Sequence, residues 1–144
     1  MRAFSRTFTV VALALGLAGA AGCDNTNTAD SSLASTTTPT VTVTETFTGT
    51  VIAKGAVTFP FAVSTAGTVT AVYAAIAPNS SQVLGLALGT WNGTSCGVII
   101  ANDAATTNVT LAGATTAAGN LCVRVYDVGK ITETQTFTLL VTHQ

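Results

Sequence analysis

Few side chains in this 144-residue sequence could perform acid–base or nucleophilic chemistry. A serine or cysteine nucleophile needs a neighbouring base, and the only histidine, His143, stands one residue from the C-terminus, where chains usually fray. A glycosidase-type carboxylate pair would have to come from Glu45, Asp103, Asp127 and Glu133. Glu45 and Glu133 have threonine neighbours that favour solvated strand faces. We therefore expect no catalytic residues, and a protein that is not an enzyme.

Metal and cofactor sites are also poorly represented. Asn102, Asp103 and Asp127 fall in predicted loops, but calcium takes about six to eight oxygen ligands, so turn formation is the simpler role for these residues. The glycines are scattered at predicted turns rather than clustered before a helix, which excludes a phosphate-binding loop. We expect neither a metal nor a cofactor.

Aromatic side chains offer a more credible chemistry, that of binding. Trp91, Tyr73 and Tyr126 are able to stack on a sugar ring or to anchor a peptide. Trp91 ends a predicted strand just before the turn signal Asn92-Gly93, so it either lines a site at the rim of the fold or closes the end of the core. Arg124 stands between two valines and should face solvent, within reach of Asp127 or Glu133.

Two of the three cysteines, Cys96 and Cys122, lie in the predicted globular part. An exported protein meets an oxidising compartment, so we expect a disulfide between them, with a free buried pair as the alternative. The bridge would close a loop of about 27 residues and stabilise the fold by about 3.5 kcal/mol. Two thiols without further ligands do not favour a zinc site.

The N-terminus is typical of an export signal. Arg2 and Arg6 precede an uncharged apolar stretch over residues 10–22, which as a helix is too short to span a bilayer. It ends in Ala20-Ala21-Gly22-Cys23, which resembles the bacterial lipobox, with Ala20 where leucine is commoner. This resemblance implies cleavage before Cys23 and acylation of Cys23. The alternative is an ordinary secretory peptide with an incidental cysteine.

Composition limits the partners of the mature chain. Removal of residues 1–22 leaves three basic and six acidic residues, a net charge of −3, which argues against nucleic acid and against electrostatic attraction to anionic lipid. Residues 24–40 are rich in threonine and serine and contain one large apolar residue, Leu33. Such a segment cannot bury enough surface to fold, so we expect residues 23–40 to form a lipidated, disordered tether.

From Val41 onward the sequence predicts strands only. Residues 41–50 alternate strictly, with Val41, Val43, Glu45 and Phe47 on one face and threonines on the other. Seven further strands are predicted at residues 57–63, 67–76, 82–91, 96–101, 108–112, 119–128 and 133–142. Turn signals separate them, among them Asn102-Asp103. Pro60 cannot donate to a strand ladder, which predicts an edge strand or a bulge there.

Eight short strands without an intervening helical pattern predict an all-β fold, an antiparallel β-sandwich spanning residues 41–144. Four segments resemble strands of bacterial pre-peptidase C-terminal (PPC) domains: 57–69, 84–88, 117–126 and 135–141. The resemblance implies a jelly-roll-like sandwich that serves as a non-catalytic accessory module. Ser80-Ser81-Gln82 stands where the family usually has an aspartate, and clustered acidic residues are lacking, so calcium binding is not implied.

Together these features predict a bacterial envelope lipoprotein, anchored to the periplasmic or outer face of a membrane through Cys23. The sandwich would act as a non-catalytic structural or interaction module that contacts an envelope protein. A carbohydrate- or peptide-binding module that uses Trp91 and nearby loops is the alternative. The inner and outer membrane are both left open, as is the identity of the ligand.

Overall fold

The structure is a computed structural model that describes residues 39–144. Its eight strands are β1 (Val43–Val51), β2 (Ala56–Val63), β3 (Gly67–Ala77), β4 (Leu84–Trp91), β5 (Cys96–Ala105), β6 (Thr110–Thr115), β7 (Gly119–Tyr126) and β8 (Gln135–His143). In this part of the chain we find no helix with the length and apolarity needed to span a bilayer. The predicted signal peptide, Cys23 and most of the tether lie outside the described residues.

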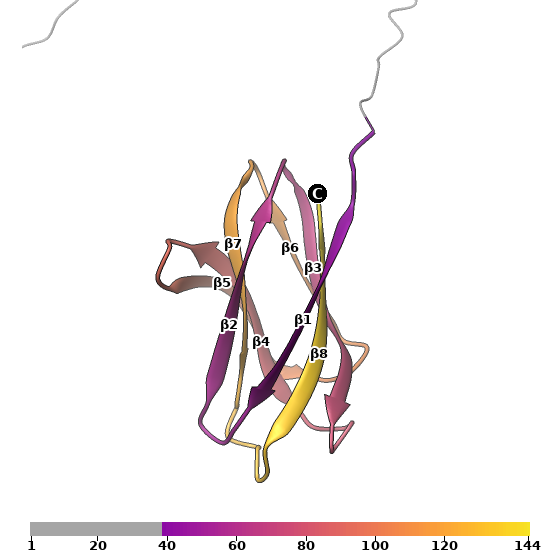
Figure 1. Ribbon diagram of the computed structural model, residues 1–144, viewed down its shortest axis with the longest axis vertical. Coiled ribbons are helices and arrows are strands. Elements are labelled where there is room, and N and C mark those ends of the chain that lie inside the picture. Colours follow the sequence, from indigo (N-terminus) through magenta and orange to yellow (C-terminus); the bar gives the residue numbers. More distant parts are fainter. Residues whose placement is uncertain (1–38) are drawn as a thin grey trace, which may run out of the picture. The chain divides into compact units, whose positions relative to one another are not determined.

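The strands form two four-stranded antiparallel sheets that pack face to face (Figure 1). One sheet has the order β1-β8-β3-β6 and the other β2-β7-β4-β5. The pairs β1–β8, β2–β7, β3–β6 and β4–β5 nest inside one another, as in a long hairpin rolled onto itself. This is the connectivity of a jelly roll. The predicted all-β, eight-stranded, jelly-roll-like sandwich is confirmed.

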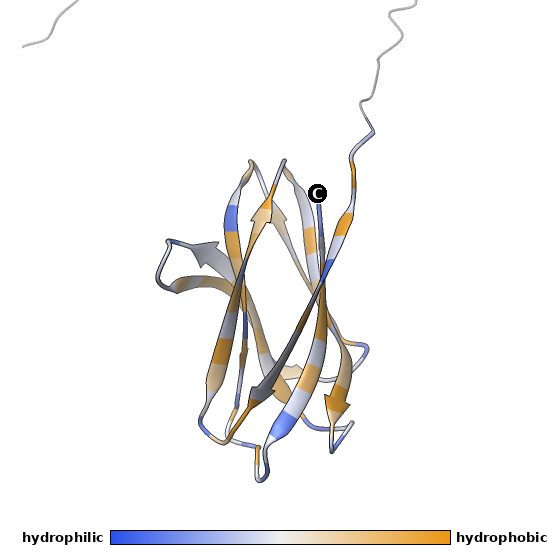
Figure 2. Cartoon of the chain, viewed as in Figure 1, coloured by the Kyte–Doolittle hydropathy of each residue, from blue (hydrophilic) through white to orange (hydrophobic). Residues whose placement is uncertain are grey.

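Strand alternation builds the core between the sheets. Along β8, the buried residues Gln135, Phe137, Leu139 and Val141 alternate with residues that face outward. The same period of two marks most strands, and Figure 2 shows it as alternating apolar and polar bands. The inward side chains of both sheets then bury one another, which is the main favourable contribution to folding.

Aromatic rings close the sandwich where β1 and β2 run along neighbouring edges of the two sheets. Phe47 stacks on Phe59 with ring centroids 5.1 Å apart, and Phe59 meets Phe137 edge-on at 6.1 Å. Phe137 also meets Tyr73 at 6.1 Å. Such arrangements add about 0.5–1.5 kcal/mol per pair beyond burial.

Pro60 lies on β2, the outer strand of its sheet, as its sequence predicts. Only one side of an edge strand pairs with a neighbour, so a residue without a backbone N–H is tolerated there. Pro60 stands opposite Cys122 of β7. The proline thus also makes this edge a poorer template for further strand addition.

Two local sequence predictions are wrong. Asn102 and Asp103 do not form a turn, because β5 continues through them to Ala105 and Asn102 pairs with Leu86 across β4. Glu133 does not lie on a strand, because β8 begins only at Gln135. In both cases strand pairing sets the boundary, because β5 stays paired with β4 as far as Ala105 and β8 begins where Gln135 pairs with Val51 of β1. Local turn signals cannot reveal this pairing.

The predicted disulfide is confirmed. Cys96 opens β5, and Cys122 lies on β7 between two inward-facing residues, so it faces outward. Since β4 runs between β5 and β7, two strand spacings of about 9–10 Å would normally separate them, but the two Cα atoms are 5.8 Å apart. The start of β5 therefore folds over the outer face of β4.

Gly89 of β4 makes this crossing possible. A methyl group built on Gly89 would overlap the backbone carbonyl of Gly97 in β5. The register of β4 with β5 also shifts at this point, between Leu88 and Gly89. The absence of a side chain at Gly89 thus lets the β5 backbone pass directly above β4.

We predict that Gly89→Ala destabilises the fold by at least about 1–3 kcal/mol, because the added methyl meets backbone rather than a movable side chain. Urea denaturation measures the effect. Gly119→Ala is the matched control, since nothing lies within 4 Å of a methyl there, and it should change stability by less than about 0.5 kcal/mol. Equal stabilities of the two variants would contradict the crossing.

Reduction of the disulfide should lower the free energy of unfolding by about 3.5 kcal/mol, because the unfolded chain regains the freedom of the closed loop. The measurement is the urea midpoint with and without reductant, with alkylation used to verify the free thiols. A Cys96→Ala/Cys122→Ala variant should be insensitive to reductant. An unchanged midpoint in the fully reduced wild type would count against this contribution.

Candidate functional site

The outer face of the β2-β7-β4-β5 sheet gathers most of the side chains capable of recognition. Arg124 and Tyr126 lie on β7, and Trp91 ends the neighbouring strand β4. Since Tyr126 pairs with Gly85, six residues before Trp91, the two aromatic residues are about 20 Å apart along this face. Strand pairing has therefore brought two of the three predicted binding aromatics to one surface, at opposite ends of it.

Trp91 is half-buried beside an open hollow of about 600 Å³. The hollow is lined by Pro60, Phe61, Ala62, Trp91, Asn92, Gly93 and Asn120. We call this set the Trp91 hollow. Its lining residues come from β2, from β7 and from the end of β4 with the turn that follows it. Figure 1 shows this β4–β5 turn projecting from the side of the sandwich.

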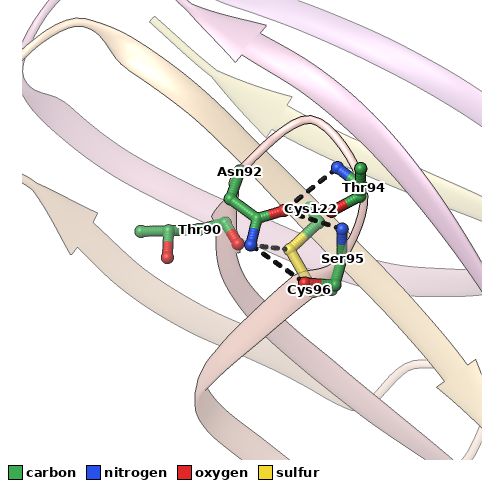
Figure 3. The surroundings of a disulfide bond; sticks show 6 residues. All are labelled: Thr90, Asn92, Thr94, Ser95, Cys96 and Cys122. Atoms are coloured by element: carbon green, nitrogen blue, oxygen red, sulfur yellow. Dashed lines mark hydrogen bonds between the residues drawn. A yellow bond between two sulfur atoms is a disulfide. The ribbon is translucent and has the colours of Figure 1, made fainter.

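The turn that carries Trp91 is held by its own side chains and by the disulfide. The Asn92 Oδ1 accepts hydrogen bonds from the backbone N–H of Thr94 at 3.0 Å and of Ser95 at 2.8 Å (Figure 3). The Asn92 Nδ2 donates to the Ser95 Oγ at 3.0 Å. Trp91 itself pairs with Cys96, which the disulfide links to β7. These contacts hold in place the turn that forms one side of the hollow.

The side chain of Tyr126 contacts two charged residues. Its hydroxyl donates to Asp103 of β5, and the Arg124 guanidinium carbon lies 5.9 Å from the centre of its ring. Burial, followed by the hydrogen bond and the negative charge of Asp103, raises the pKa of Tyr126 to about 12. Arg124 is exposed as predicted, and the contact that it makes is with the ring of Tyr126.

Tyr73 must be removed from the predicted binding residues. It is 1% exposed, and its hydroxyl donates to the backbone carbonyl of Gly85 at 3.0 Å, inside the core. Burial raises the pKa of this phenol as well. Sequence alternation placed Tyr73 on a strand, but only the packing of β3 against the second sheet decided that its ring faces inward.

The expected fraying at His143 is also wrong. His143 pairs with Val43 of β1, is 4% exposed, and has its ring centroid 5.4 Å from that of Phe61. Its Nε2 lies 2.9 Å from a carboxylate oxygen of Glu45, which is half-buried rather than on a solvated face. This pair links β1 to β8 at the end of the sandwich and packs on the aromatic core, which is a structural role. No local pattern could predict this pair, since 98 residues separate the partners.

Asp127 organises a turn, as expected for this residue type. Its Oδ2 accepts the Lys54 N–H at 2.7 Å, and its Oδ1 accepts the N–H groups of Gly129, Lys130 and Ile131 at 2.8–3.1 Å. These donors, Lys54 first, hold the pKa of Asp127 below its usual range. Through these hydrogen bonds, the Asp127 carboxylate links the β1–β2 turn to the β7–β8 loop.

Asn102 and Asp103, the other two residues considered as calcium ligands, also form hydrogen bonds within the protein. The Asn102 Oδ1 accepts the Ala104 N–H at 2.9 Å, and Asp103 holds Tyr126. Among residues 39–144, three or more histidine, cysteine, aspartate or glutamate side chains nowhere gather closely enough to hold a metal ion.

A second concavity opens between the edges of the two sheets at β5 and β6. It has a volume of about 340 Å³ and an apolar lining that includes Leu88, Ile100 and Leu121. Ile99, at the bulge of β5, is 70% exposed beside it. Its lining also includes Thr90, Thr115 and Thr116 but no aromatic residue, whereas the Trp91 hollow combines an indole ring with asparagine amides, which makes the Trp91 hollow the better candidate site.

Sequence reasoning identified Trp91 but missed its partners in the hollow. Pro60 and Ala62 come from β2 and Asn120 from β7, about 30 residues before and after Trp91. They meet Trp91 only because β7 lies between β2 and β4. A local pattern holds no information about this order.

Comparison with known proteins supports the fold. No protein-family model matches the sequence, and no curated protein matches it. The structure is similar to the crystal structure of the Yersinia pseudotuberculosis-derived mitogen, with a TM-score of 0.51 and 21% identity. That similarity covers 72% of this chain and 88% of the mitogen chain. At this identity it establishes a shared β-sandwich architecture.

Tyrosine titration tests the Tyr126–Asp103 contact. The sequence holds two tyrosines, and burial raises the pKa of both, to about 12 for Tyr126. We predict little tyrosinate absorbance near pH 10, the ordinary tyrosine pKa. Asp103→Ala removes an acceptor and a negative charge, so the first titration should move to lower pH. Glu133→Ala, at an exposed position, should leave it in place. Identical curves for wild type and Asp103→Ala would contradict the contact.

Proposed function

We propose that this chain is a bacterial envelope lipoprotein, held by acyl groups on Cys23, that displays a non-catalytic β-sandwich as an interaction module. The anchor is supported by the sequence Ala20-Ala21-Gly22-Cys23 at the end of an apolar segment. Several acyl chains, at about 0.8 kcal/mol per buried methylene, would make attachment effectively permanent.

The non-catalytic role is supported by the engagement of three candidate catalytic groups, His143, Glu45 and Asp127, in the fold. His143 lies within hydrogen-bond distance of Glu45 and packs on Phe61 at the end of the sandwich. Asp127 accepts hydrogen bonds from four backbone N–H groups. A catalytic group needs access to substrate and freedom to exchange a proton. These side chains instead join strands and loops to one another.

We also propose that the sandwich is related to PPC domains. The four segments that resemble that family coincide with or overlap β2, β4, β7 and β8, and the sandwich has the jelly-roll order that the resemblance implies. A non-catalytic accessory module of this kind would act by contacting other molecules.

The single observation that carries the interaction role is the asymmetry of the two outer faces. The β2-β7-β4-β5 sheet presents Trp91, Arg124 and Tyr126, whereas the β1-β8-β3-β6 sheet presents mainly threonines. Aromatic and arginine side chains are the types enriched at contact sites. We therefore assign partner contact, with an envelope protein or a glycan, to the first face.

Intact mass of the membrane-extracted protein tests the anchor. We expect a chain that begins at Cys23 and carries acyl mass, with two alkylatable thiols that appear only after reduction. Cys23→Ser should abolish both acylation and membrane retention. Cys96→Ala/Cys122→Ala is the control and should remain acylated. An unlipidated chain that starts at or after Cys23 would instead indicate a freely secreted domain.

A further inference from the structure

We propose that the Trp91 hollow binds a neutral saccharide. This deepens the interaction role proposed above, on which it rests, by naming the site and the class of ligand. It does not depend on the lipid, because the hollow is formed entirely by the sandwich.

The dimensions of the hollow fit a small ligand. Its volume of about 600 Å³ lies within the range of about 300–1,000 Å³ that small-molecule sites occupy. It is open to solvent between the projecting β4–β5 turn and the β2–β7 edge. One or two sugar rings of a longer chain could enter such a site and leave the rest of the glycan outside.

The lining offers the two kinds of contact that a sugar ring requires. The half-buried indole of Trp91 provides an apolar surface for the C–H face of the ring. Asn120, an exposed residue of β7, provides an amide that can both donate to and accept from hydroxyl groups. The Asn92 side chain is already engaged in its turn, so Asn120 is the polar group available to the ligand.

Charge decides the class of saccharide. None of the seven residues that line the hollow is ionisable. A carboxylated or sulfated sugar would therefore lack a cationic partner in the hollow and lose part of its hydration without compensation. A neutral sugar loses less on entry, and its hydroxyl groups match the amide of Asn120 and the exposed backbone of the turn.

The rigidity of the site favours binding. The disulfide joins β5 to β7 beside the hollow, and the Cys122 Sγ lies 3.3 Å from the backbone carbonyl of Thr90 (Figure 3). Four hydrogen bonds of the Asn92 side chain fix the turn that follows Trp91. A site ordered before binding loses little further conformational entropy, which allows a small contact area to give measurable affinity.

The protein carries its own reporter for this proposal, because Trp91 is the only tryptophan in the sequence. Its fluorescence would be followed during titration of the full chain with neutral hexasaccharides of β-1,4-glucose, α-1,4-glucose, α-1,6-mannose and β-1,4-N-acetylglucosamine. We expect at least one to give a saturable change below about 10 mM, since a site with Kd near 1 mM is then about nine-tenths occupied. An acidic hexasaccharide, hexagalacturonic acid, should not.

Variants locate the binding. Asn120→Ala keeps the reporter and should weaken binding about two- to tenfold, through the loss of a hydrogen bond. Trp91→Ala, followed by calorimetry, should abolish it, while Trp91→Phe should retain part of it. Thr48→Ala, on the outer face of the other sheet, is the matched control and should bind as wild type.

Each other outcome overturns the proposal. Lack of a saturable response to all four neutral sugars excludes the class, and unchanged affinity in both Asn120→Ala and Trp91→Ala excludes the site. Saturable binding of an unstructured peptide library in place of sugar would assign the hollow to peptides. Failure here leaves the mass measurement on Cys23 unaffected, so the anchor and the saccharide site are judged separately.

Discussion

The structure depends first on burial of every second side chain between two sheets. Val123 and Val125 of β7, Leu139 and Val141 of β8, and their counterparts on the other strands lie inward and are almost completely inaccessible. Because a shift of one residue would turn each set outward, this burial fixes the register of all eight strands. The hollow, the aromatic edge and the outer faces are consequences of that register.

The second constraint is the passage of β5 over β4. It requires Gly89, where a side chain would meet the Gly97 carbonyl, and the Cys96–Cys122 bridge holds it. The crossing turns the β4–β5 hairpin away from the sheet and leaves Trp91 at its base. The Trp91 side chain, which would otherwise simply lie at the end of a strand, therefore lines a concave surface. The same covalent link thus supports both stability and the candidate site.

The two outer faces have different physical characters. On the β1-β8-β3-β6 sheet, Thr44, Thr48 and Thr50 stand opposite Thr142, Thr138 and Thr136, and the Thr44 and Thr142 hydroxyls lie 2.9 Å apart. Threonine suits exposed strands because its branched side chain packs along the pleat while its hydroxyl remains hydrated. The opposite face carries aromatic, arginine and amide groups. This division explains how a chain with 8% charged residues retains one surface suited to recognition.

The sequence by itself determined the elements of this protein. Alternation of apolar and polar residues predicted eight strands near their observed positions, Pro60 predicted an edge strand or a bulge, and the two cysteines of the globular part predicted a bridge. These inferences succeeded because each depends on local geometry or on covalent chemistry. Whether Tyr73 faces the core, whether His143 is ordered and what surrounds Trp91 were decided by the tertiary structure alone. Each depends on which strands lie side by side, and that order arises from the packing of the whole chain.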